Sequence, residues 1–169
     1  AALSFDLSVY DIFGVMATGG ALIMPNHDIK GDPKHWLDLL EAHAVTVWNT
    51  APPVMTMLLD YVASSFVARE RFSKLHMRLV LLSGDFIPLK TAPTLKQLLP
   101  SKDLVVCSLG GATEASIWSC YHVIDDVLPE WKRSCLILCD SFLHVFPFSL
   151  PPTLPCSVAS GLPLCEAMW

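Results

Sequence analysis

From residue 4 to about residue 124, helical patterns alternate with short runs of apolar and β-branched residues. The first predicted helix runs from Leu7 to Thr18, Gly19-Gly20 ends it, and the strand Ala21–Met24 follows. Helices that alternate with strands along a chain are typical of βα units. The pattern therefore predicts an α/β fold with a mostly parallel sheet.

The later segments repeat this alternation. Asp32 is a predicted N-cap with Pro33 in the first helical position, and Met55, Met57 and Met77 are interpreted as packing residues. The charged stretch from Arg69 to Lys74 is predicted to be a solvated linker. The remaining predicted elements are helices from Pro33 to about His43, Pro52 to Val62 and Leu89 to Leu99, and strands Val45–Trp48, Leu79–Leu82, Val105–Cys107 and about Ile117–Ile124.

Three residues stand at the ends of neighbouring predicted strands: Asn49, Ser83 and Leu109. In open α/β sheets, ligands bind outside the carboxyl ends of the strands. We therefore expect these three residues to converge on one crevice.

The segment from Ser108 to Ser119 joins a glycine turn to a hydroxyl and a carboxylate. Gly110-Gly111 permits a sharp turn and a close approach to a ligand, Thr113 suits a phosphate, and Glu114 suits a hard cation such as Mg²⁺. An ordinary strand-to-loop turn has the same pattern, so the motif alone leaves both alternatives open.

Composition excludes several function classes. Charged residues make up only 16% of the 169 residues and the net charge is -5, so the chain offers no basic surface for nucleic acid. Its six cysteines lack zinc-finger spacing, its six histidines are scattered, and no apolar run reaches the roughly 20 residues of a membrane span. Without a secretory signal, a cytoplasmic location is expected. The low charge and the absence of an initial Met lead us to expect a fragment.

The pattern is lost after about Ser134. Residues 134–169 are apolar and rich in proline, without a clear helical or strand period. We therefore expect two parts, residues 1–133 and an unrelated, irregular tail at 134–169. A frameshift or intron read-through is the hypothesis for that tail, and a translation of the coding sequence in all three frames that gave no continuation of the pattern would refute it.

With these segments in place, the chain resembles the adenylation domain of nonribosomal peptide synthetases, in the AMP-binding, adenylate-forming family. The similar motifs are Phe5-Asp-Leu-Ser8, the strand and turn Leu79–Asp85, and Gly110-Gly-Ala-Thr-Glu114, where the family usually has Tyr-Gly-Pro-Thr-Glu. The resemblance implies part of the large subdomain of the adenylate-forming fold. The form of this last motif, with Gly110 and Ala112 in place of Tyr and Pro, is similar to that of modules that activate cysteine in siderophore synthetases.

The resemblance also implies an amino-acid pocket. Asp6 would pair with the α-ammonium group of the substrate, and the other positions would shape a small pocket for a thiol. The residues matching this cysteine-selecting pattern are Asp6, Leu7, Tyr10, Asn49, Leu81, Ser83, Leu109, Ile117 and Trp118. Each has an ordinary alternative: Asp6 as a helix cap, Tyr10 and Trp118 as core aromatics, Asn49 and Ser83 as turn residues.

By resemblance, Gly110, Gly111, Ala112 and Thr113 would contact ATP, with Thr113 and Glu114 as catalytic residues and Glu114 as the Mg²⁺ ligand. The implied reaction gives an aminoacyl adenylate, which a phosphopantetheine thiol of a carrier domain captures beside condensation or cyclisation domains.

The family's upstream Gly-rich loop and C-terminal lysine have no match here, so the isolated chain is expected to be inactive. The alternatives are a non-catalytic truncated product or another adenylate-forming ligase for acyl or aryl acids.

Overall fold

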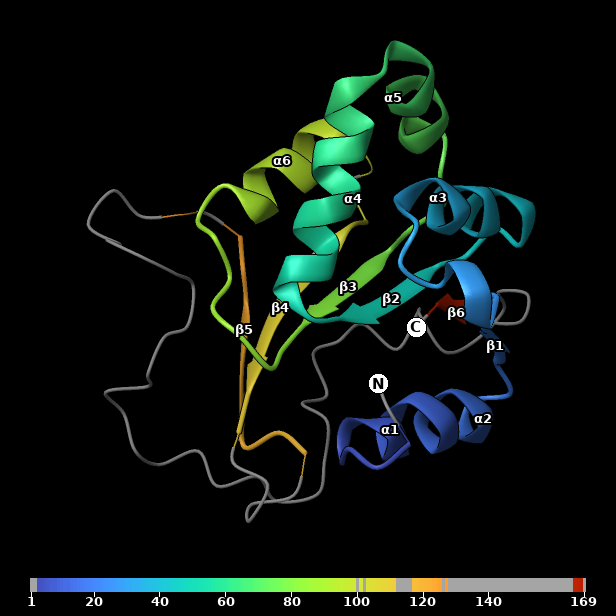
Figure 1. The fold of residues 1–169 in the computed structure, drawn as a ribbon. Helices are drawn as coiled ribbons and strands as arrows, with labels where there is room; N and C mark the ends of the chain where they lie inside the picture. Colours follow the sequence, from blue (N-terminus) through green and yellow to red (C-terminus); the bar gives the residue numbers. More distant parts are fainter. Residues whose placement is uncertain are drawn as a thin grey trace.

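The computed structural model describes residues 3–99, 101, 103–111, 117–125 and 127, and the backbone of 166–168. These residues form a six-stranded sheet in the order β1-β6-β2-β3-β4-β5 (Figure 1). All neighbouring strands are parallel except β4 and β5, which are antiparallel. The predicted α/β class with a mostly parallel sheet is therefore confirmed. The strands are β1 (Ala21–Ile23), β2 (Val47–Thr50), β3 (Leu79–Leu82), β4 (Val105–Gly110), β5 (Cys120–Val123) and β6 (Glu166–Met168).

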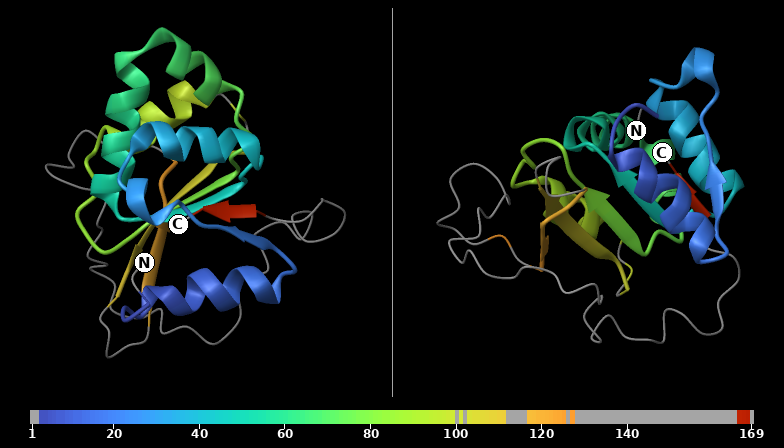
Figure 2. Two further views of the ribbon diagram at one scale, coloured as in Figure 1. Left: turned by 45° about the vertical axis from the view of Figure 1, so that its right-hand side comes forward. Right: turned by 90° about the horizontal axis from the view of Figure 1, so that it is seen from below.

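Helices lie on both faces of this sheet. Figures 1 and 2 show the helices from α3 to α6 on one side and the N-terminal helical segment on the other. The four are α3 (Pro33–Ala42), α4 (Pro52–Ser64), α5 (Phe66–Ser73) and α6 (Thr91–Leu98). The N-terminal helical segment consists of α1 (Leu7–Val9), the π-helical turn η1 (Tyr10–Gly14) and α2 (Val15–Ala17), and a short 3-10 turn, η2 (His27–Ile29), follows β1.

The main core lies between the sheet and α3–α6. Trp48, Val80 and Val106 of three adjacent strands pack there against buried helix residues such as Leu37 and Leu58. Trp36 of α3 meets Trp48 edge-on, with ring centroids 6.2 Å apart. We call this side of the sheet the helix-covered face.

Several predicted elements are confirmed. Asp32 caps α3, where its Oδ1 accepts a hydrogen bond from the Lys34 backbone N–H at 2.9 Å. Strand β3 has the predicted bounds, and the helix predicted from Leu7 to Thr18 runs from Leu7 to Ala17 with one π turn, Thr18 being its C-cap. None of the described helices is long and apolar enough to cross a membrane.

Strand β2 begins two residues later than predicted. After α3, Ala44 adopts a left-handed conformation with φ of 46°, and the Val45 N–H bonds back to the Leu40 carbonyl at 3.1 Å. Because this turn at the helix end engages the Val45 backbone N–H, Val45 does not join the strand.

The predicted linker around Arg69 is wrong, because these residues form α5. The Ser65 side chain caps this helix, and Ala68 and Phe72 are buried beneath it. Its charges are partly structural: Arg71 contacts Asp38 and Glu41 of α3 at 2.8 and 2.6 Å. The sequence of a charged helix resembles that of a linker when the helix buries few residues.

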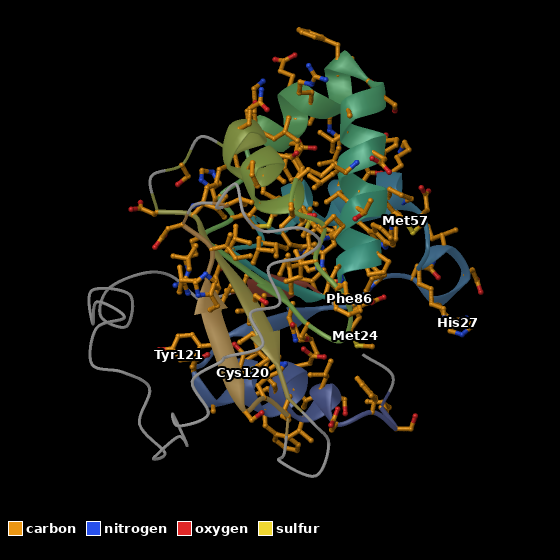
Figure 3. The ribbon with its side chains drawn as sticks, turned by 90° about the vertical axis from the view of Figure 1, so that its left-hand side faces the viewer. Met24, His27, Met57, Phe86, Cys120 and Tyr121 are labelled. Carbon is orange, nitrogen blue, oxygen red and sulfur yellow. The ribbon has the colours of Figure 1, made fainter. Side chains whose placement is uncertain are left out.

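Met57 is a second correction. Met55 and Met77 are buried as predicted, but Met57 is 48% exposed on the outer side of α4 (Figure 3). Residues three or four positions apart share one side of a helix, whereas residues two positions apart do not. Met55 and Met57 therefore cannot both face the core.

The expected irregular tail contains one described element. The backbone of 166–168 lies between β1 and β2 as strand β6, with Glu166 in register with Ala21 and Ala167 with Val47. The rest of 134–169 lies outside the described residues.

Candidate functional site

The parallel strands β2, β3 and β4 bring the predicted pocket positions to one side of the sheet. Asn49 is in register with Leu81, and Leu81 with Cys107. Side chains alternate along a strand, so Ser83 and Leu109, two residues further on, face the same side. We call these five residues the Leu81 face, which lies opposite the helix-covered face.

The three strands also end at the same edge, as expected for parallel neighbours. Thr50, Leu82 and Gly110 are their last residues. Asn49 and Leu109 therefore lie inside their strands rather than just past them, and Ser83 directly follows β3. The expected convergence of Asn49, Ser83 and Leu109 at this edge agrees with the strand order.

The N-terminal helical segment adds an aromatic side chain to this face. Tyr10 packs against the cluster of Leu81, Cys107 and Leu109, as does Trp118. The two rings contact each other with centroids 4.7 Å apart and an interplanar angle of 60°. Four of the predicted pocket residues thus share one small apolar cluster.

Gly14 explains where the Tyr10 ring lies. A Cβ atom at Gly14 would come within 2.9 Å of Tyr10 Cδ2, closer than such atoms pack. Glycine four residues on in the helix therefore leaves the space that the ring fills. The π-helical turn spans Tyr10 to Gly14, and such turns recur at functional sites.

A buried polar pair joins this segment to β2. Asp11 is 5% exposed, and Asn49 Nδ2 donates a hydrogen bond to its Oδ1 at 2.5 Å. Burial raises the pKa of the Asp11 carboxyl, and the bond from Asn49 opposes that rise. A charged carboxylate in this position costs desolvation energy, which its hydrogen bonds offset only in part.

Three buried polar atoms at predicted pocket positions lack partners among the described residues. They are Oδ1 of Asn49, Oγ of Ser83 and Nε1 of Trp118. Buried polar groups in proteins are nearly always hydrogen-bonded, and each unsatisfied group costs about 1–3 kcal/mol. One acceptor, one indole donor and one hydroxyl are thus unpaired within the described part of the chain. A fourth such atom, Nε1 of Trp48, belongs to the main core instead.

Cys107 also lies on the Leu81 face, between Leu81 and Leu109. Burial raises the pKa of its thiol to about 11. The thiol is therefore un-ionised at neutral pH and suits a packing role rather than a nucleophilic one.

The glycine turn after β4 has a structural reason of its own. A Cβ atom at Gly111 would come within 2.7 Å of the Ser119 backbone nitrogen and 3.0 Å of Trp118 Cα. The Ser119 N–H bonds to the Gly110 carbonyl at 2.9 Å, and the chain turns there into β5 (Cys120 and Tyr121 in Figure 3). Gly111 thus lets Trp118 approach β4.

Asp6 occupies the N-cap position of α1 without acting as a cap. Its backbone is helical, and within the described residues its side chain accepts no hydrogen bond from the first turn. Asp32 in the equivalent position of α3 does accept one. The ordinary alternative for Asp6, a helix cap, is therefore not supported. Leu7 and Ile117 are half-buried.

A hollow elsewhere on the molecule takes no part in this arrangement. It has a volume of about 250 Å³ and lies between α3 and α5, lined by residues including Leu40, Glu41, Arg71 and His76. None of the predicted pocket residues lines it, and the Arg71 guanidinium is already paired with two carboxylates.

The chain matches the AMP-binding enzyme family over residues 1–137. It belongs to that family.

Individual relatives include two synthetases known by name and a solved nonribosomal peptide synthetase. Pyochelin synthetase PchF of Pseudomonas aeruginosa is 45% identical over 122 residues, which cover 70% of this chain and 6% of that protein. Bacitracin synthase 1 of Bacillus licheniformis is 40% identical over 131 residues, covering 78% and 2%. The AMPPNP-bound structure of the synthetase FmoA3 superimposes with a TM-score of 0.70 and 34% identity, covering 79% of this chain and 14% of that one.

These matches confirm the resemblance inferred from the motifs and the partial adenylate-forming fold. The chain spans only a small part of the relatives it matches. FmoA3 holds a nucleotide analogue.

The residues predicted for nucleotide and metal lie partly outside the described chain. Ala112, Thr113 and Glu114 are among the residues that the structure does not describe. In the described ranges, no three His, Cys, Asp or Glu side chains lie close enough together to hold a metal ion. The roles of Thr113 and Glu114 stay predictions.

Sequence reasoning missed Asp11, Gly14 and Cys107. Asp11 had a visible signal, because it is the one charge within the apolar helix between Leu7 and Thr18. Gly14 had a weaker signal, which is its position four residues after the aromatic Tyr10 in the predicted helix. Cys107 was assigned only to a buried strand, and its side of the sheet follows from strand register, which sequence alone does not reveal.

Proposed function

We propose that this chain is part of a domain that activates an amino acid with ATP to form an aminoacyl adenylate. The observation that carries the proposal is the set of unsatisfied polar atoms on Asn49, Ser83 and Trp118. They belong to positions that the family resemblance assigns to an amino-acid pocket. A small polar substrate would satisfy them.

We further propose L-cysteine as the amino acid. Asp6 makes no cap hydrogen bond within the described residues and so remains available for the α-ammonium group. The residues Leu81, Leu109 and Tyr10 form apolar walls suited to a thiol. The full set of nine positions resembles the cysteine-selecting pattern, and pyochelin synthetase is among the relatives.

In the proposed reaction, a carboxylate oxygen of the amino acid forms a bond to the α-phosphorus of ATP. The bond from that phosphorus to the bridging oxygen of pyrophosphate breaks, and pyrophosphate leaves. No nucleophile from the protein is required, so its residues act by positioning and charge compensation. Binding of AMPPNP by FmoA3 supports ATP as the nucleotide.

Gly110, Gly111, Ala112 and Thr113 are the proposed ATP contacts, and Glu114 is the proposed Mg²⁺ ligand. Mg²⁺ would supply charge neutralisation at the phosphates, for which a carboxylate is a suitable ligand. The proposed partners are a carrier domain whose phosphopantetheine thiol accepts the acyl group, and condensation or cyclisation domains in the same cytoplasmic synthetase. Residues 1–133 are the proposed extent of the adenylation part.

The test is exchange of labelled pyrophosphate into ATP, measured with the complete protein that carries this chain. We expect exchange that depends on cysteine and that acyl or aryl acids without an amino group do not support. Exchange driven by such acids would indicate another adenylate-forming ligase. A lack of exchange with every substrate would indicate a non-catalytic product.

A further inference from the structure

Asn49 and Asp11 form a contact that the pocket pattern does not include. The two residues are 38 positions apart in sequence, and the 2.5 Å hydrogen bond joins the N-terminal helical segment to β2. Asp11 itself is 5% exposed, and its carboxylate contacts Asn49, a residue of the proposed pocket. Through this bond Asp11 can act on a ligand by way of Asn49.

The chemistry of the pair fixes the orientation of the amide. An ionised carboxylate only accepts hydrogen bonds, whereas a carboxamide offers two donors at nitrogen and an acceptor at oxygen. Asn49 must therefore turn its Nδ2 toward Asp11. Its Oδ1 is left as the free end, and this buried oxygen has no partner among the described residues.

We propose that Asp11 is a positioning residue that holds the Asn49 amide so that Oδ1 accepts a hydrogen bond from the side-chain thiol of the bound amino acid. This inference rests on the proposed function, because it presumes an amino acid on the Leu81 face. It adds a specificity-determining role for a residue outside the pocket itself. A site built to accept a hydrogen bond discriminates against substrates that lack the donor, because its own buried acceptor is then left unpaired.

The effect of Asp11 on the stability of the fold helps to distinguish a positioning role from a structural role. Burial raises the pKa of its carboxyl. A raised pKa in the folded protein contributes stability only below the unfolded value near 3.8, and that contribution is lost as the pH rises through the folded value. At neutral pH that contribution is absent, so ionisation of Asp11 does not stabilise the fold.

The experiment compares two substrates of almost equal shape in the complete protein that carries this chain. L-2-aminobutyrate replaces the thiol of cysteine by a methyl group and cannot donate. For wild type we expect pyrophosphate exchange with a clearly higher kcat/KM for cysteine. Asp11→Leu should lower that cysteine preference by about two- to fivefold, the lower part of the range for one hydrogen bond because a thiol is a weak donor.

Asp11→Asn is the conservative variant. Its amide oxygen can still accept from Asn49 Nδ2, so most of the preference should return. Ser8→Ala is the matched control, because Ser8 is a buried residue of the same helical segment and donates to the Leu3 carbonyl at 3.3 Å. It loses a hydrogen bond in that segment without touching Asn49, so the preference should stay at the wild-type value.

Urea unfolding of each variant at pH 7 completes the test. The proposal expects Asp11→Leu to lose preference without a loss of stability beyond that of Ser8→Ala. An unchanged preference for cysteine over 2-aminobutyrate in Asp11→Leu overturns the positioning role while leaving the proposed function intact. A wild type with no amino-acid-dependent exchange overturns both. If Asp11→Leu does not fold, an Asp11→Asn variant that drops fully to equal use of both substrates overturns the role as well.

Discussion

The two faces of the sheet differ in the kinds of side chain that they bury. The helix-covered face packs large apolar residues, among them Trp48, Leu37 and Leu58, in one continuous core. The Leu81 face, with Asp11 and Trp118 beside it, holds a small apolar cluster, a buried carboxylate and three polar atoms unsatisfied among the described residues, against one, Trp48 Nε1, in the main core. Apolar burial stabilises a fold, whereas unsatisfied polar groups and a buried charge lower its stability. We infer that the first face provides stability and the second is shaped for a ligand.

The aspartates Asp6 and Asp32 give the sharpest form of this comparison. Both stand at the N-cap of a helix, but only Asp32 accepts a cap hydrogen bond. If the faces are specialised, removal of Asp6 should impair activation, and removal of Asp32 should impair only stability.

The largest expected effect is on activity. In the complete protein, Asp6→Ala should lower kcat/KM for cysteine by at least about a hundredfold, because the α-ammonium group loses its charged partner. Pyrophosphate exchange measures this loss, and urea unfolding should show stability within about 0.5 kcal/mol of wild type. A variant that retains most of its exchange would contradict the assignment of Asp6.

A cavity in the helix-covered face should have the reverse effect. Leu58→Ala removes a fully buried side chain of α4 and should lower the free energy of unfolding by about 2–5 kcal/mol. The ratio of kcat/KM for cysteine over serine should not change, provided that the assay is run where the variant is folded. A changed ratio would show that the two faces are coupled.

Cys107 predicts a pH dependence that arises on the Leu81 face. Its folded pKa of about 11 exceeds the reference value of 9.0, so its contribution to stability is present below pH 9 and is lost as the pH rises through 11. Between pH 8 and pH 10.5, wild type should lose about 2 kcal/mol more than Cys107→Val. Urea unfolding at both pH values gives the comparison, and equal losses in the two proteins would refute it.

The smallest effect concerns the cap of α3. Asp32→Ala removes the hydrogen bond to the Lys34 N–H and should lower the free energy of unfolding by about 1 kcal/mol. Exchange with cysteine should match wild type in the complete protein. Loss of exchange in this variant would mean that the contrast between Asp6 and Asp32 does not separate binding from stability.

Much of the fold was predictable because its signals are local. The Asp32-Pro33 start of α3 and the apolar run of β3 depend on neighbouring residues alone. Helix α5 was missed because its buried residues, Ala68 and Phe72, are few and its charges resemble a linker. The start of β2 depended on one left-handed residue, Ala44, which sequence does not mark.

The sequence allowed us to predict which residues form the candidate site, but not how they contact one another. The family resemblance supplied positions such as Asn49 and Trp118, whereas nothing local links Asn49 to Asp11 across 38 residues. That contact depends on the register of β2 against β3 and on the way the N-terminal helical segment packs beneath them. Strand β6 was missed for the same reason, because pairing partners far apart in sequence leave no local pattern.

The most direct test of the central proposal compares cysteine with serine in pyrophosphate exchange by the complete protein that carries this chain. The two amino acids differ by one atom, sulfur or oxygen, so the comparison examines the pocket alone. We predict a higher kcat/KM for cysteine. Equal values for the two amino acids, or a preference for serine, would contradict the assignment of the Leu81 face as a cysteine pocket.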